Sequence, residues 1–145
     1  MEEKNKAWKT VSSKYLFRRP WLTVRCEDML LPNGNHIPEY YILEYPDWVN
    51  TIAITKDGQF VFVRQYRPGI ERTCYELCAG VCEKEDASPL VSAQRELWEE
   101  TGYGKGNWQE YMVISANPST HTNPVSYTHL RPHETEADLA CRLLL

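Results

Sequence analysis

The fold of this chain is decided by residues 95–103, which read RELWEETGY. On a helix, Glu100 lies about 40° to one side of Glu96 and Glu99 about 60° to the other, so the three carboxylates share one face. Like charges at this spacing destabilise a helix by roughly 0.2–0.5 kcal/mol per pair. Arg95 is the only basic residue nearby on this helix. Three crowded glutamates therefore call for an explanation other than helix stability.

Binding of a divalent cation would explain why three carboxylates lie on one face of the helix. Mg²⁺ prefers oxygen ligands, keeps several waters and binds through a few carboxylates together with substrate phosphates. The alternative is a solvated acidic helix face, which is common on proteins. The three glutamates by themselves leave both interpretations open.

The helix that carries these glutamates is predicted over residues 89–101. Ser88 provides an N-cap, a proline follows at the first helical position, and Gly102 stops the last turn. Leu90, Ala93 and Leu97 fall within an arc of about 100°, which is the width of a buried stripe. We therefore expect one helix that packs on a sheet through these three residues.

The sequence before this helix predicts strands. Apolar, β-branched and aromatic residues favour strands at 20–31, 40–45, 51–55 and 60–63, with a short extended piece at 73–77. Asn33-Gly34 supplies a tight turn, so the first two strands are expected to form a hairpin. Several strands followed by one helix indicate an α+β domain.

Composition narrows the class of protein. The chain has 145 residues, 42% hydrophobic and 25% charged, which suits one globular domain. A net charge of −4 argues against nucleic-acid binding by bulk electrostatics. The sequence contains neither an apolar run of the length that a membrane span needs nor an apolar signal peptide, and its cysteine number, five, is odd. We expect a soluble cytoplasmic protein with free thiols, not associated with membranes.

Residues 95–103 resemble, at every defined position, the core of the Nudix box, R-E-U-x-E-E-x-G-U, where U is aliphatic or aromatic. Gly80 stands where the opening glycine of that box belongs. Four further stretches, 46–49, 65–68, 76–80 and 117–120, are similar to the ADP-ribose pyrophosphatase-like branch of the family. The resemblance covers residues 8–123 and implies the Nudix fold, an α/β/α sandwich with a mixed sheet.

This resemblance implies a reaction. Nudix enzymes hydrolyse a diphosphate linked to a nucleoside, using Mg²⁺ or Mn²⁺ and an activated water. By position, Glu96, Glu99, Glu100 and the carbonyl of Ala79 would bind the metal ions, and Glu99 and Glu100 would be catalytic. The implied substrate is ADP-ribose or an ADP-sugar. The alternatives are a GDP-sugar, another dinucleotide, or a nucleotide-binding module without turnover.

The resemblance also implies roles for residues around the glutamates. Arg67 is expected to clamp a phosphate or ribose, although an exposed arginine at a strand end is the alternative, and Glu76 is expected to face the same cleft. Arg95 would brace a glutamate, while Gly80 and Gly102 would be structural. Relatives of this branch form homodimers through N-terminal strands, so we expect a homodimer for the full-length protein.

Two positions depart from the family pattern. The loop after Gly80 has one extra residue, so that Glu85 or Asp86 replaces the first glutamate of the box. Cys78 stands where relatives usually have proline. Both changes lie beside the glutamate helix, and neither removes an expected metal ligand.

The C-terminal residues do not resemble the family. Residues 125–130, VSYTHL, can be encoded by the transposon-end sequence of common sequencing-library adapters, and residues 141–145 resemble the flow-cell end of the same adapter. The alternative is a divergent natural C-terminus. We expect residues 1–45 to form an N-terminal extension, 46–123 an incomplete Nudix domain and 124–145 a non-native tail. A chain truncated in this way, without the strands and general base beyond the box, is expected to bind Mg²⁺ weakly and hydrolyse ADP-ribose poorly or not at all.

Overall fold

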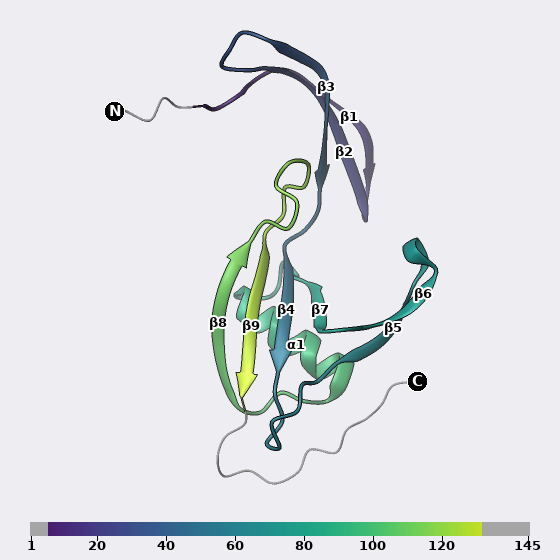
Figure 1. The fold of residues 1–145 in the computed structure, drawn as a ribbon, viewed down its shortest axis with the longest axis vertical. Coiled ribbons are helices and arrows are strands. Elements are labelled where there is room, and N and C mark those ends of the chain that lie inside the picture. Colours follow the sequence, from purple (N-terminus) through teal and green to yellow (C-terminus); the bar gives the residue numbers. More distant parts are fainter. Residues whose placement is uncertain (1–5, 132–145) are drawn as a thin grey trace, which may run out of the picture. The chain divides into compact units, whose positions relative to one another are not determined.

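The computed structural model describes residues 6–131 and divides them into two compact units (Figure 1). Unit 1 comprises the residues up to Tyr45 together with Ser115–Asn123, and unit 2 comprises the remainder. The elements are β1 (Lys9–Arg19), β2 (Leu22–Leu30), β3 (His36–Glu44), β4 (Trp48–Ala53), β5 (Val63–Arg67), the 3₁₀ turn η1 (Pro68–Ile70), β6 (Arg72–Glu76), β7 (Cys78–Val81), α1 (Pro89–Thr101), β8 (Asn107–Ile114) and β9 (Val125–Arg131).

Unit 1 is a three-stranded antiparallel sheet in the order β1-β2-β3. The predicted hairpin is confirmed as β2–β3, with Gly34 at a φ of 87° in its turn. The sequence did not predict β1, which is exposed along its whole length. Residues 115–123 attach to this sheet because Leu43 donates to Thr120 at 2.8 Å and accepts from Thr122 at 3.1 Å.

Unit 2 is built on a mixed four-stranded sheet in the order β7-β4-β9-β8. β4 runs antiparallel to β7 and parallel to β9, and β8 pairs antiparallel with β9 at the edge of the sheet. Alternate residues of β4, Val49, Thr51 and Ala53, are buried. The strand predicted at 60–63 is wrong: Phe60 forms only an isolated bridge, and the regular strand β5 begins at Val63 and pairs with β6.

The helix α1 begins and ends at the predicted residues. The Ser88 hydroxyl accepts from the Val91 amide at 3.3 Å, and Gly102 adopts a φ of 74° as its amide donates to the Trp98 carbonyl at 2.9 Å. Leu97 is buried in a cluster with Ala53, Cys78 and Leu130. This packing holds α1 against β4 and β7. Within residues 6–131, α1 is the only α-helix, so the second helical layer of the expected sandwich is not among them.

Strand β9 comes from the segment that we expected to be non-native. Residues 125–128 have fair β-propensity, and the segment does pair as a strand. β9 lies between β4 and β8, with Thr128 and Leu130 buried (Figure 1). The hydroxyls of Thr51 and Thr128 lie 3.3 Å apart. The Ala, Leu and Glu content of residues 134–144 favours a helix, but these residues lie outside the described part of the chain. The adapter origin of the tail stays a prediction.

In the part of the chain that the structure describes, no helix is both long enough and apolar enough to cross a membrane.

Replacing Leu97 with alanine tests the contact between α1 and the sheet. Leu97 is fully buried, so truncation leaves a cavity and should lower the free energy of unfolding by about 2–5 kcal/mol in urea titrations followed by circular dichroism. Val91→Ala is the matched control, because Val91 is 38% exposed on the same helix and its truncation should cost less than about 0.5 kcal/mol. Equal losses in the two variants would contradict this packing.

Candidate functional site

The carboxylate of Glu96 lies directly over the backbone of Gly80. A Cβ atom at residue 80 would stand 1.9 Å from Cδ of Glu96, far inside van der Waals contact. The Arg95 guanidinium donates to Oε1 of the same carboxylate at 2.9 Å. A glycine is therefore required at the end of β7 so that the first glutamate of α1 can lie against the strand.

Glu100 is partly buried and is held through both carboxylate oxygens. Oε1 accepts from Nε2 of Gln65 at 2.9 Å, and Oε2 accepts from the backbone amide of Ala79 at 3.3 Å. Burial raises the pKa of Glu100, and the charge of Glu96 raises it further, while the hydrogen bonds from Ala79 and Gln65 act in the opposite direction. This carboxylate is thus held in a fixed orientation beside a second negative charge.

Arg95 is the centre of the charge network on α1. Nη2 donates to the Val81 carbonyl at 2.9 Å and to Asp86 at 3.0 Å, and Nη1 contacts Glu96 at 2.9 Å and Glu99 at 3.4 Å. The hydrogen bond from Arg95 lowers the pKa of Asp86, and the same contact raises the pKa of Arg95. Arg95 therefore contacts glutamates, as the resemblance implied.

Of the two acids proposed to replace the first glutamate of the box, Asp86 contacts Arg95. Asp86 also accepts from the Ser92 hydroxyl at 2.8 Å and from the Glu83 amide at 3.2 Å. These contacts close the loop between β7 and α1 onto the first turns of the helix. The loop with its extra residue therefore places Asp86 against Arg95, and the replacement of the first glutamate of the box stays a prediction.

Glu96, Glu99 and Glu100 all lie on α1, and the backbone of Ala79 contacts Glu100 where β7 meets the helix. Glu99 is exposed, and Glu96 and Glu100 turn to separate protein donors, so no group of three metal-ligating side chains is already gathered among residues 6–131. The donors are all hard oxygens, and the Gly80 cradle leaves room for the Glu96 carboxylate. Such a donor set suits Mg²⁺ or Mn²⁺.

Arg67 and Glu76 meet on the β5–β6 hairpin. Nε of Arg67 donates to the two Glu76 oxygens at 2.9 and 3.0 Å, and Nη2 donates to Oε2 as well. The hydrogen bond from Arg67 lowers the pKa of Glu76. The charge of Glu100 contributes to the raised pKa of Arg67, so this ion pair lies within electrostatic range of the α1 glutamates.

Two residues beside Glu100 were not singled out as functional from the sequence. Gln65 was noted only as part of a family-like stretch, and Cys78 only as a departure from it. Burial raises the pKa of the Cys78 thiol to about 12, and the charge of Glu100 raises it further. Because both interactions join segments far apart in the chain, no local sequence pattern signals them.

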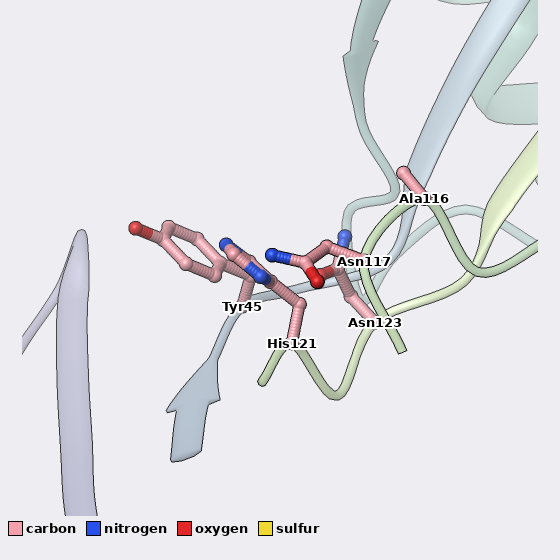
Figure 2. A pocket seen from close by; sticks show the side chains of 5 residues that line it. All are labelled: Tyr45, Ala116, Asn117, His121 and Asn123. Carbon is pink, nitrogen blue, oxygen red and sulfur yellow. The ribbon is translucent and has the colours of Figure 1, made fainter. Parts of the chain in front are cut away.

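Unit 1 contains a separate pocket of about 250 Å³, lined by Tyr45, Ala116, Asn117, His121 and Asn123 (Figure 2). The rings of Tyr45 and His121 stack with centroids 5.3 Å apart and planes 17° apart. Nδ1 of His121 lies 3.1 Å from the Thr120 hydroxyl. His121 therefore packs on its neighbours in unit 1.

Several named proteins are similar to this chain. It is 38% identical to the ADP-ribose pyrophosphatase of Bacillus subtilis and 39% identical to the methanol dehydrogenase activator of Bacillus methanolicus. Each of these matches extends over 95 residues and covers 66% of this chain and 50% of the relative. It is 28% identical over 141 residues to the ADP-ribose pyrophosphatase of Mycobacterium tuberculosis, covering 91% of this chain and 68% of that protein. The chain thus spans about half the length of the first two relatives.

A solved structure and two family models give the remaining comparisons. The crystal structure of an ADP compounds hydrolase superposes with a TM-score of 0.77 at 22% identity, covering 92% of this chain and 74% of that one, which supports the α+β fold. The nucleoside diphosphate sugar hydrolase N-terminal domain matches residues 8–43, and the NUDIX domain matches residues 45–140, beyond the end of β9. Because this second match covers more than half of the chain and includes the glutamate helix, the protein belongs to the NUDIX domain family.

Proposed function

We propose that this protein hydrolyses the pyrophosphate bond of a nucleoside diphosphate linked to another moiety, ADP-ribose or an ADP-sugar, in the cytoplasm with Mg²⁺ or Mn²⁺. The observation that carries the proposal is that α1 of a NUDIX domain carries three glutamates, the first of which, Glu96, lies against Gly80. The match of residues 8–43 to a nucleoside diphosphate sugar hydrolase domain supports the substrate class. The names of two relatives, each an ADP-ribose pyrophosphatase, support the same choice.

Glu96, Glu99, Glu100 and the carbonyl of Ala79 would hold the metal ion. When bound, such an ion neutralises the pyrophosphate and lowers the pKa of a bound water. Arg95 contacts two of these glutamates and thereby reduces the repulsion among three carboxylates on one helix face. The backbone amide of Ala79 and the side chain of Gln65 hold Glu100.

Arg67 supports binding of the anionic substrate. A guanidinium has five N–H donors, and Glu76 engages those at Nε and Nη2 while it fixes the plane of the group. The donors that remain match phosphate or ribose oxygens. We therefore propose that Arg67 binds the substrate. Glu76 orients Arg67 and lies on the same binding surface.

The proposed activity is tested with a substrate panel. ADP-ribose, an ADP-sugar, a GDP-sugar and a dinucleotide are incubated with and without Mg²⁺ or Mn²⁺, using this chain and a version extended to the length of its relatives. Metal-dependent cleavage of ADP-ribose or the ADP-sugar by the extended version is the expected result. Preference for the GDP-sugar or the dinucleotide would change the substrate, and binding without cleavage would contradict the enzyme assignment.

Replacing Glu99 or Glu100 with glutamine keeps the size of the side chain and removes one negative charge from the metal site. We expect each change to lower kcat of the extended version by orders of magnitude while circular dichroism shows an unchanged fold. Glu110→Gln on the exposed strand β8 is the matched control and should retain activity. Wild-type turnover in both Glu99→Gln and Glu100→Gln would refute the metal assignment.

Gly80→Ala tests the cradle. The new methyl group would overlap the Glu96 carboxylate, so we expect displacement of that side chain, at least about tenfold weaker Mn²⁺ binding in a calorimetric titration and reduced turnover. Gly69→Ala is the matched control, because a Cβ there meets nothing within 4 Å and its φ is not positive. Equal Mn²⁺ affinity in the two variants would show that Glu96 does not need this cradle.

We also propose that the full-length protein is a homodimer that associates through the sheet of unit 1. Large apolar side chains of β1, including Leu16 and Phe17, are exposed, and Phe17 has 56% of its surface accessible. Sedimentation velocity should show a dimer for the extended version, and Phe17→Asp should shift the population toward monomer because it places a charge on this surface. A monomer for the unsubstituted protein at micromolar concentration would contradict the proposal.

A further inference from the structure

One side chain outside the glutamate helix makes direct contact with a proposed metal ligand. Nε2 of Gln65, on β5, lies 2.9 Å from Oε1 of Glu100, on the last turn of α1. The two residues are 35 positions apart in the chain, and both are partly buried. The contact therefore depends on the position of the β5–β6 hairpin relative to α1 within unit 2.

The chemistry of the pair fixes which way the amide of Gln65 points. An ionised carboxylate only accepts hydrogen bonds, so Gln65 must present its NH₂ group and not its carbonyl oxygen. The backbone amide of Ala79 donates to the other oxygen, Oε2, at 3.3 Å. With one donor on each oxygen the carboxylate cannot rotate freely, and each oxygen keeps a further lone pair for another partner.

Resting on the proposed function, we propose that Gln65 is a positioning residue that orients the Glu100 carboxylate for binding of a divalent cation. The other donor to Glu100 is the Ala79 amide, which is fixed in place because it belongs to strand β7 and this strand pairs with β4. Gln65 donates from its side chain, so a substitution can remove this hydrogen bond, whereas the bond from the Ala79 backbone would remain. Partners that orient a metal-binding side chain typically contribute 10–100-fold in metal affinity.

The hairpin that carries Gln65 also carries the Arg67–Glu76 pair, with Gln65 and Arg67 on the same strand. Alternate residues of a strand lie on one face, so residues 65 and 67 share a face of β5. The Gln65 contact therefore links α1 to the strand that holds the proposed substrate-binding arginine. This connects the metal-binding and the anion-binding parts of unit 2 through one hydrogen bond.

The experiment measures Mn²⁺ affinity by electron paramagnetic resonance of free Mn²⁺, at a temperature where circular dichroism shows each variant folded. Gln65→Leu should bind Mn²⁺ 10–100-fold more weakly than the wild type. Gln59→Leu is the matched control, because Gln59 is an exposed turn residue and its side chain makes no hydrogen bond in the described part of the chain. It should bind like the wild type.

Two further variants separate positioning from a general structural role. Gln65→Asn keeps the carboxamide but withdraws it by one methylene, so it should bind Mn²⁺ as weakly as Gln65→Leu, and it replaces that variant if leucine prevents folding. In a background of Glu100→Gln, adding Gln65→Leu should weaken binding no further, because Gln65 acts through Glu100. Wild-type affinity in Gln65→Asn and Gln65→Leu, or fully additive losses in the double variant, would overturn the inference.

Failure of this inference is distinguishable from failure of the proposed function. Mn²⁺ binding that depends on Gln65 in a protein that cleaves nothing on the substrate panel would refute the hydrolase and leave the positioning role standing. Cleavage with Gln65-independent Mn²⁺ affinity would refute the positioning role alone. A wild-type protein that does not bind Mn²⁺ would overturn both.

Discussion

The arrangement of unit 2 depends on one cation among several anions. The guanidinium of Arg95 contacts Asp86, Glu96 and Glu99, and it also reaches the backbone carbonyl of Val81. Without this cation, the helix face and the preceding loop would hold like charges close together in a partly buried region, which is unfavourable. Arg95 thus joins the end of β7, the loop and α1 into one structure, and it contacts two of the proposed metal ligands, Glu96 and Glu99.

Local signals predicted the helix well because they act within a few residues. The Ser88 cap, the proline that follows it and Gly102 define α1 to the residue, and Leu97 is buried as the apolar stripe required. The β2–β3 hairpin was predictable for the same reason, since an Asn-Gly turn encodes it. The glutamates and Gly80 could be placed together because the helix pattern and the family resemblance agree.

Features that depend on distant partners were not predictable in this way. β1 is exposed along its whole length and forms because β2 pairs with it. Residues 60–62 have the composition of a strand but find no continuous partner. The choice between Glu85 and Asp86 depends on where the Arg95 side chain lies in space. Gln65 becomes significant only when the β5–β6 hairpin brings it to Glu100.

The position of β9 has a consequence for the order of folding. β9 lies between β4 and β8, and the buried hydroxyl pair that joins β4 to β9 links residues 77 positions apart. During synthesis β4, β7 and α1 leave the ribosome first. β9 can take its place beside β4 only after residue 131 has left the ribosome. Closing so long a loop costs conformational entropy before the parallel hydrogen bonds between β4 and β9 can form. Sheets of this kind therefore form slowly. Until then the apolar residues of β4 and α1 lack part of their cover, and a nascent chain in that state is a natural client for a chaperone.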